Sequence, residues 1–146
     1  MKISINYDPD IKEPELLVIC KEYNEDIREI LSCISLINNN VPGVCGEETF
    51  FIPLSDVLYF ETVDGKVFFY TADKTYETTT KMYRLEEKFE NTPFSRISKS
   101  IIVNLRQVRS IKPEKNSRMC VALSNGERVI VSRQYLNDIR KKLGVK

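Results

Sequence analysis

Histidine and tryptophan are absent from this chain of 146 residues, and glycine occurs only five times. Without histidine there is no Ser-His or Cys-His pair for nucleophilic catalysis and no histidine-containing metal site. No glycine-rich run resembles a phosphate-cradling loop. The acidic pair Glu86-Glu87 has charged neighbours, so we interpret it as solvated surface rather than as an acid–base pair. We therefore expect neither an enzyme nor a bound cofactor or metal.

Long hydrophobic runs are missing as well. No stretch approaches the roughly 20 apolar residues of a transmembrane helix, and the start MKISINYDPD lacks the apolar region of a signal peptide. The four cysteines show no Cys-x-x-Cys spacing, and we interpret them as free, buried thiols of a reducing compartment: Cys20, Cys33, Cys45 and Cys120. These features predict a cytoplasmic protein.

The charge is divided unevenly along the chain. Residues 1–94 carry 9 Lys+Arg against 18 Asp+Glu, whereas residues 95–146 carry 13 against 3, although the whole chain has a net charge of only +1. A basic region of one sign attracts polyanions such as nucleic acids. The alternative is that the acidic half packs against the basic half and neutralises it within the fold. Charge alone leaves both interpretations open.

The N-terminal part predicts a strand–strand–helix unit. Residues 2–7 alternate as a strand does, and the short apolar run 15–21 also suits a strand. Asn24 is placed to cap a helix over 24–37. The apolar residues of this helix recur at helical spacing over a broad face: Ile27, Ile30, Leu31, Cys33, Ile34, Leu36 and Ile37. Residues 38–46 are interpreted as a linker or turn.

From residue 49 onward the pattern is one of short strands with close turns. Strands are predicted over 49–54, 57–63, 66–71, 75–80, 118–124 and 128–132. Asp64-Gly65 is a hairpin turn signal, and a helix with Met82, Leu85 and Phe89 on one face follows the fourth strand. A last helix is predicted from Ser132, as its N-cap, to a stop at Gly144. The aromatic residues of the strands are interpreted as core rather than as a stacking platform for single-stranded nucleic acid: Phe50, Phe51, Tyr59, Phe60, Phe68, Phe69 and Tyr70.

The stretch SRISKSIIVNLRQVRSI, residues 95–111, is basic without interruption. Its apolar centre lies between the cations Arg96 and Lys99 on one side and Arg106 and Arg109 on the other, with no acidic residue. A strand that only had to fold would usually carry both signs of charge on its exposed face. The pattern indicates that this stretch faces a negatively charged partner.

Four pieces of the chain resemble, in the same order, the LytTR-type DNA-binding domain of many bacterial transcriptional regulators. They are LSDVLYFET (54–62), YETTTKMYRLEEKF (76–89), FSRISKSIIVNL (94–105) and VIVSRQYLNDIRKKL (129–143). The third resembles the family's most diagnostic run, an aromatic residue and Arg leading into Ser-x-x-Val-Asn. No single piece is specific, but the four stand in register over roughly two-thirds of the chain.

The resemblance implies an elongated, mainly β fold of antiparallel strands that reads double-stranded DNA with loops, not with a recognition helix. By position in the family pattern, base contacts fall to Lys66, Ser98, Lys99 and Arg133. Residues beside these loops are expected to contact phosphate: Arg96, Ser100, Arg106 and Arg109. Many members have His followed by Arg or Asn where this chain has Ser and Lys at 98–99, so their base specificity does not transfer.

Arg133 and Asn104 have expected roles of their own. If Ser132 caps the last helix, Arg133 lies in its first turn, where amides, the helix dipole and the guanidinium converge. Such a group suits a phosphate or the acceptor edge of guanine. The alternative is a surface arginine without a partner. Asn104 is expected to lock a turn through its side chain and is left out of the contact set.

The sequence thus predicts two parts, an extension over 1–46 and a LytTR-like DNA-binding domain over 47–146. The extension is acidic, so it should lie away from DNA, and its broad apolar helix is expected to join two protomers as a homodimer. The resemblance implies a standalone regulator without a receiver domain, of a kind often encoded beside a small membrane protein that controls it. We expect a sequence-specific double-stranded DNA-binding transcriptional regulator. The alternative is a non-enzymatic protein-interaction module whose basic edge binds an acidic partner.

Overall fold

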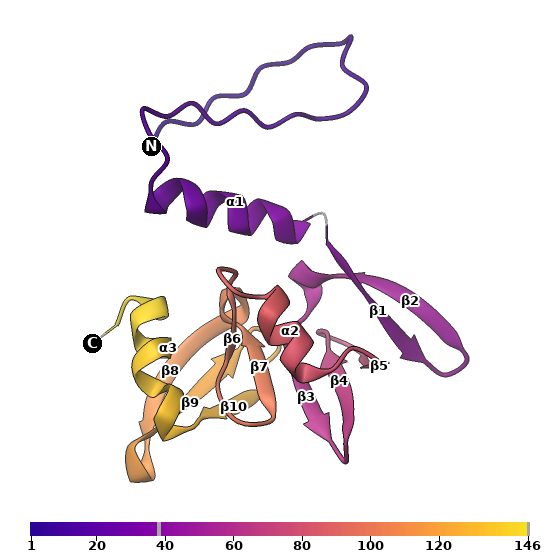
Figure 1. Cartoon of the computed structure of the whole chain (residues 1–146), viewed down its shortest axis with the longest axis vertical. Coiled ribbons are helices and arrows are strands. Elements are labelled where there is room, and N and C mark those ends of the chain that lie inside the picture. Colours follow the sequence, from indigo (N-terminus) through magenta and orange to yellow (C-terminus); the bar gives the residue numbers. More distant parts are fainter. Residues whose placement is uncertain (38, 146) are drawn as a thin grey trace.

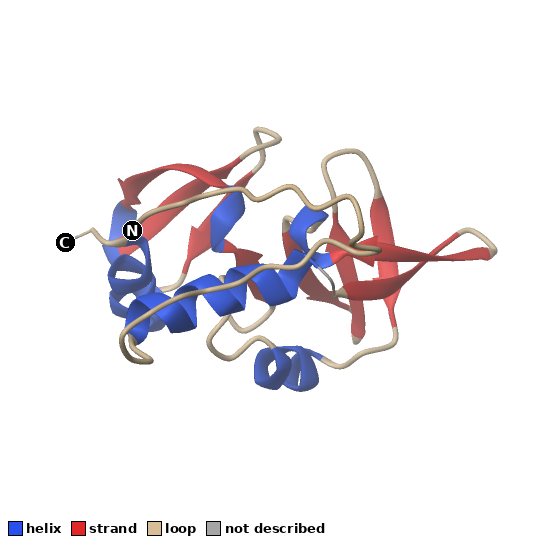
Figure 2. Ribbon diagram, turned by 90° about the horizontal axis from the view of Figure 1, so that it is seen from above, coloured by secondary structure: helices blue, strands red, loops and turns tan. Residues whose placement is uncertain are grey.

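The computed structural model describes residues 1–37 and 39–145, except for the side chains of Ser32, Cys33, Ser35, Leu36 and Ile37. Two antiparallel sheets form the body of the molecule (Figures 1 and 2). The larger sheet has the strand order β2-β1-β5-β4-β3-β7-β6. Its strands are β1 (Asn40–Cys45), β2 (Glu48–Pro53), β3 (Tyr59–Val63), β4 (Lys66–Tyr70), β5 (Thr75–Thr78), β6 (Phe94–Arg96) and β7 (Ile101–Asn104). The smaller sheet, ordered β10-β9-β8, consists of β8 (Val108–Glu114), β9 (Arg118–Leu123) and β10 (Arg128–Val131).

In the described residues, three α-helices accompany the sheets: α1 (Glu25–Ile37), α2 (Met82–Lys88) and α3 (Leu136–Leu143). Every pairing between the described strands is antiparallel, which confirms the expected mainly β fold with a C-terminal helix. The helix ends at Gly144, whose φ of 74° gives the left-handed cap that the sequence predicts. Within the described part of the chain, no helix is both long and apolar enough to span a lipid bilayer.

The N-terminal strands of the sequence prediction are wrong for the single chain. Residues 2–7 and 15–21 form no strand and lie almost entirely exposed (Figure 1). A lone pair of strands is marginal in water, and none of the described strands pairs with these two segments. The helix that follows is confirmed, because the Asn24 side-chain oxygen accepts a hydrogen bond from the Ile27 amide at 3.1 Å. The expected contributions of Cys33, Leu36 and Ile37 to its apolar face lie outside the described side chains.

The predicted linker over 38–46 is also wrong, because most of it forms β1. This strand pairs with β2 from Asn40↔Pro53 to Cys45↔Glu48 and reaches β5 through Val44↔Glu77. Proline and glycine are turn formers, so the Pro42-Gly43 pair concealed the strand. Gly43 is needed for packing: a Cβ there would lie 2.7 Å from Tyr76 Cβ and would collide with the Phe69 ring.

Two hydrophobic clusters fill the body. The first packs α2 on the larger sheet around Phe60, Phe69 and Leu85, and the second joins α3 to residues of both sheets around Val121 and Ile139. Most strand aromatics belong to this core, as predicted, but Phe51 on the edge strand β2 is 69% exposed. The prediction of buried thiols holds for Cys120 and is wrong for Cys20 and Cys45, which are exposed; Cys33 lies outside the described side chains.

Candidate nucleic-acid interface

The first predicted base-reading position lies in a tight hairpin between β3 and β4. Asp64 and Gly65 have φ angles of 51° and 78°, as a two-residue turn with both residues left-handed requires. Lys66 begins β4, pairs with Val63, and its side chain is exposed. The turn therefore presents a lysine at one end of the larger sheet on a rigid base.

The second position is the loop between β6 and β7, residues 97–100. Ile97 is fully buried and anchors the loop, whereas Lys99 is exposed. The Ser98 hydroxyl oxygen accepts a hydrogen bond from the Ser100 amide at 3.2 Å, which closes a small turn. The neighbouring hydroxyls of Ser98 and Ser100 lie 3.5 Å apart. Ser98 and Ser100 are thus partly occupied within the loop, and the Lys99 ammonium is its most accessible polar group.

The third position, Arg133, is placed differently from the sequence expectation. It begins a 3-10 turn, Arg133–Tyr135, that precedes α3, and the Ser132 side chain makes no capping hydrogen bond. The Ser132 carbonyl instead accepts the Tyr135 amide at 3.0 Å, which tightens the backbone into a 3-10 turn before the helix starts. Arg133 therefore lies in a 3-10 turn before α3 and not in the first turn of the helix, and Ser132 does not cap it through its side chain. The exposed guanidinium donates to the Asn116 carbonyl at 3.3 Å.

Backbone hydrogen bonds connect these three loops. The Thr62 amide, at the end of β3, donates to the Ser100 carbonyl at 2.9 Å. The Ser132 amide donates to the Ile97 carbonyl at 2.8 Å. Figure 1 shows the three loops on the lower side of the sheets, opposite α1 and the N-terminal segment, as the charge of that segment predicted. The fold thus gathers on one side the residues that the sequence placed in separate segments.

The residues expected to hold phosphate have contrasting environments. Arg106 and Arg109 are exposed, and Arg109 lies at an irregularity where β8 shifts register against β9. The Arg96 side chain is only 21% exposed and forms an ion pair with Glu86. Whether Ser100 and these three arginines contact phosphate stays a prediction.

Sequence reasoning missed the turn between β8 and β9. Asn116 and Ser117 are both left-handed, with φ angles of 62° and 59°, and the exposed cations Lys115 and Arg118 flank them. Asn116 and Arg118 line a shallow cavity together with Ser132, Arg133 and Gln134. A signal was present, because Lys-Asn-Ser-Arg joins turn-forming residues to two cations.

Asn104 has the role that the sequence predicted. It is 1% exposed, its amide nitrogen donates to the Val57 carbonyl at 2.9 Å, and its side-chain oxygen accepts the Arg106 amide at 3.1 Å. The backbone amide of Asn104 also donates a hydrogen bond, to the Leu58 carbonyl at 2.9 Å. The side chain therefore fixes the passage from β7 toward β8, close to the basic stretch.

A pair of stacked tyrosines links the two sheets at the ends of β3 and β4 that lie away from the Asp64-Gly65 turn. The rings of Tyr59 and Tyr70 lie 4.4 Å apart, centroid to centroid. The Tyr59 hydroxyl donates to Glu127 at 2.7 Å across the two sheets, and the Tyr70 hydroxyl donates to Glu61 at 2.9 Å. Burial, and then the hydrogen bond to Glu61, raise the pKa of Tyr70 to about 12. The pKa of Tyr59 is raised by burial and by its bond to Glu127. Both phenols thus remain neutral donors that hold carboxylates in place.

Comparison with known proteins places the chain in a family. Residues 47–144 match the family model of the LytTr DNA-binding domain. The chain is 29% identical to the LytTr DNA-binding domain of a methyl-accepting/DNA response regulator from Bacillus cereus, with a TM-score of 0.69 over 73% of this chain and 97% of that one.

Curated relatives agree with this match. The sensory transduction protein LytT of Bacillus anthracis is 32% identical over 68% of this chain and 40% of its own length, and LytT of Bacillus subtilis is 27% identical over 86% and 52%. This chain therefore spans about half or less of those relatives. An uncharacterised HTH-type transcriptional regulator of Staphylococcus aureus is 24% identical over 99% of both chains. The chain belongs to the LytTR family of DNA-binding domains.

Proposed function

We propose that this chain is a cytoplasmic, non-enzymatic transcriptional regulator that binds double-stranded DNA at specific sequences. The observation that carries the proposal is the alignment of three hydrogen-bonded loops on one side of the sheets, each presenting an exposed cation: Lys66, Lys99 and Arg133. Loops of this reach can enter a major groove, whose base edges carry a distinct donor and acceptor pattern for every base pair. Lys66, Ser98, Lys99 and Arg133 are the proposed base contacts.

Phosphates are proposed to bind at Ser100 in the 97–100 loop and at Arg106 and Arg109, which follow the other end of β7. Arg106 and Arg109 are exposed in the basic stretch, and the Ser100 hydroxyl lies in the loop itself. Contacts of this kind fix the register of a protein on the duplex, and each neutralised phosphate makes binding more sensitive to salt.

Fluorescence anisotropy at several salt concentrations tests the proposal. The probe is a duplex that the wild-type chain selects from a random pool, and a scrambled duplex serves as reference. With about five phosphates neutralised, log affinity should fall against log salt with a slope of roughly −4 to −5. A flat salt response and no preference for the selected duplex would overturn the proposal in favour of an interaction module for acidic proteins.

Arg133→Ala separates base reading from general attraction. Removing a base contact should cost about 1–3 kcal/mol on the selected duplex and relax the preference at one base pair. Arg128→Ala is the matched control, because Arg128 is an exposed arginine at the other end of β10, so the charge changes equally. An equal loss from both variants on both duplexes would contradict the assignment of Arg133.

We further infer that residues 1–37 join two copies of the chain into a homodimer. Large apolar side chains of this segment are exposed in the single chain by 65–91%: Ile3, Ile5, Tyr7, Leu16, Leu17, Ile19 and Tyr23. An apolar surface of this extent is uncommon on a monomer and marks an interaction site. Strand pairing with a second copy would supply the additional strands that the extended segments lack. A homodimer would place two DNA-binding modules on a repeated site.

Sedimentation at micromolar concentration tests the dimer. Leu17→Asp with Ile19→Asp should yield a monomer without unfolding the domain, because both side chains are over 80% exposed. Lys12→Gln with Lys21→Gln changes the net charge by the same amount and should leave the dimer intact. A monomeric wild type would overturn the dimer and would leave this surface for another partner, such as the small membrane protein that the family resemblance implies.

A further inference from the structure

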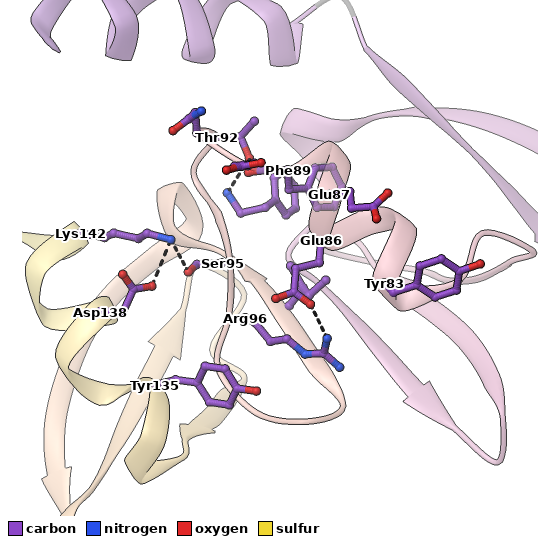
Figure 3. A pocket seen from close by; sticks show the side chains of 14 residues that line it. Tyr83, Glu86, Glu87, Phe89, Thr92, Ser95, Arg96, Tyr135, Asp138 and Lys142 are labelled. Atoms are coloured by element: carbon purple, nitrogen blue, oxygen red, sulfur yellow. Dashed lines mark hydrogen bonds and ion pairs between the residues drawn. The ribbon is translucent and has the colours of Figure 1, made fainter.

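Arg96 is more extensively bound than a phosphate-contacting arginine should be. It is the last residue of β6, and its guanidinium meets three acceptors from two segments. Nε donates to the Ser98 carbonyl at 3.1 Å, and Nη2 donates to the Lys99 carbonyl. Nη1 forms an ion pair with Glu86 of α2 at 2.5 Å, as Figure 3 shows. Each of the three nitrogens of this side chain therefore donates a hydrogen bond within the protein.

These bonds determine the shape of the 97–100 loop. Arg96 holds the carbonyls of Ser98 and Lys99, and the Thr62 amide holds the carbonyl of Ser100. Three successive carbonyls thus point toward the protein, while the Lys99 side chain remains exposed. A loop without such bonds would sample many conformations, and the entropy of ordering it would reduce the affinity for DNA.

Glu86 completes the arrangement from the neighbouring helix. It lies on the exposed face of α2, next to the buried Leu85 and about one turn before the buried Phe89, which fix the helix on the sheet. Its side chain is 52% exposed, so the ion pair adds little to the stability of the fold, but it directs the guanidinium. Arginine is suited to this position because its planar fork offers several donors in a fixed geometry.

We propose that Arg96 is a positioning residue for DNA recognition: held by Glu86, it sets the 97–100 loop in the conformation that presents Ser98 and Lys99 to the bases. Arg96 does not itself neutralise a phosphate, contrary to the expectation from its charge alone. This inference rests on the proposed DNA-binding function. Specificity at the base pairs read by the loop thus depends on a residue that touches no base.

The salt dependence of binding distinguishes positioning from phosphate contact. Arg96→Ala should weaken binding to the selected duplex about tenfold or more, as losing base contacts does, and flatten the preference at the base pairs read by the loop. The slope of log affinity against log salt should stay unchanged. Arg96→Lys should not restore the preference, because one ammonium cannot reproduce the fork. The control is Arg109→Ala. This variant should make the slope less negative by about 0.9 and reduce the affinity for all duplexes alike. If Arg96→Ala made the slope less negative by the same amount and kept the base preference, the proposal would be overturned.

Glu86→Ala gives a second test, because a positioning role and a competition with phosphate predict different changes in the affinity for DNA. If Glu86 positions Arg96, its removal should reduce the ratio of affinities for the selected and the scrambled duplex. If Glu86 only competed with phosphate for Arg96, the variant should bind both duplexes more tightly at an unchanged ratio, and the proposal would fail. Glu87→Ala is the matched control, because it removes the same charge from the next residue of α2, which is exposed, and leaves the Arg96–Glu86 ion pair in place.

Hydrogen exchange in the free protein tests the loop without DNA. In Arg96→Ala the Ser100 amide, which donates to the Ser98 hydroxyl, should exchange faster than in the wild type, while the amides of the β3–β4 hairpin should not change. Unchanged protection at Ser100 would refute the positioning role. A wild-type chain with no preference for any duplex would refute the DNA-binding function instead, so the two failures are distinguishable.

Discussion

Asn104 should contribute more to stability than any exposed polar residue of the basic stretch. Its side chain is 1% exposed and satisfies two backbone groups, the Val57 carbonyl and the Arg106 amide. In Asn104→Ala both lose their partner. A buried group left without a hydrogen bond costs about 1–3 kcal/mol, and Val57 is fully buried whereas Arg106 lies beside solvent. We therefore expect a loss of about 2–4 kcal/mol in the free energy of unfolding.

Asn104→Asp should be worse than alanine at neutral pH. The substitution keeps an acceptor for the Arg106 amide but turns a carboxylate oxygen toward the Val57 carbonyl, so a buried charge meets another acceptor. Burial raises the pKa of the introduced carboxyl above its unfolded value. The destabilisation by the buried charge is therefore absent below the pKa of this carboxyl in the unfolded chain. It grows as the pH rises from that value through the higher pKa in the folded protein, so acidification should recover stability.

Urea unfolding followed by circular dichroism measures both effects. With a slope of about 1–3 kcal/mol per molar urea, a loss of this size lowers the midpoint by on the order of 1–2 M without changing the slope. Asn137→Ala, on the exposed face of α3, is the control and should change stability by less than about 0.5 kcal/mol. The reasoning would be refuted if Asn104→Ala cost no more than the control, or if alanine and aspartate cost the same at every pH.

Two further predictions concern the larger sheet. Gly43→Ala should destabilise the β1–β2 hairpin by about 1–3 kcal/mol, because the new methyl group would overpack the Phe69 and Tyr76 side chains, and a reduced urea midpoint with faster amide exchange in β1 would confirm it. The contribution of Tyr70 to stability should be constant up to about pH 10, the unfolded pKa of tyrosine, and be lost as the pH rises through the folded pKa of Tyr70 at about 12. Urea midpoints of Tyr70→Phe should therefore fall less steeply than those of the wild type above about pH 10, and an equal fall in both proteins would contradict the assignment.

The sequence pattern was sufficient to predict those parts of the fold that neighbouring residues determine by themselves. The alternation in β3 and β4, the Asp64-Gly65 turn and the glycine that stops α3 follow from backbone preferences of single residues, and all are present. Strand β1 was missed because its Pro42-Gly43 pair looks like a turn in the sequence. Gly43 is instead required by a tertiary contact, the close approach of the Phe69 ring. The strands predicted before residue 22 failed for the opposite reason: their alternation is locally strand-like, but the single chain offers them no sheet.

The candidate site shows the same division. Charge and family pattern identified Lys66, Lys99 and Arg133, which are exposed as expected. The partners of Arg96 could not be derived from the sequence, because Glu86 reaches it only after α2 has packed on the sheet. The contact of Arg133 with the β8–β9 turn likewise joins residues that are 17 positions apart through the register of the smaller sheet.

The divided charge of the chain can now be interpreted from the positions of its ion pairs. Among the described ion pairs, Arg28–Glu25 lies within the acidic half and Lys142–Asp138 within the basic half, whereas Arg96–Glu86 joins the two. The acidic segment before residue 38 lies on the side of the sheets opposite the three loops (Figure 1). Residues 39–94 pack against the basic half through the pairing of β3 with β7, so part of the charge is balanced within the fold, whereas the acidic segment before residue 38 lies away from the loops. The cations of the loops face solvent on one side of the molecule, where a polyanion can reach them together.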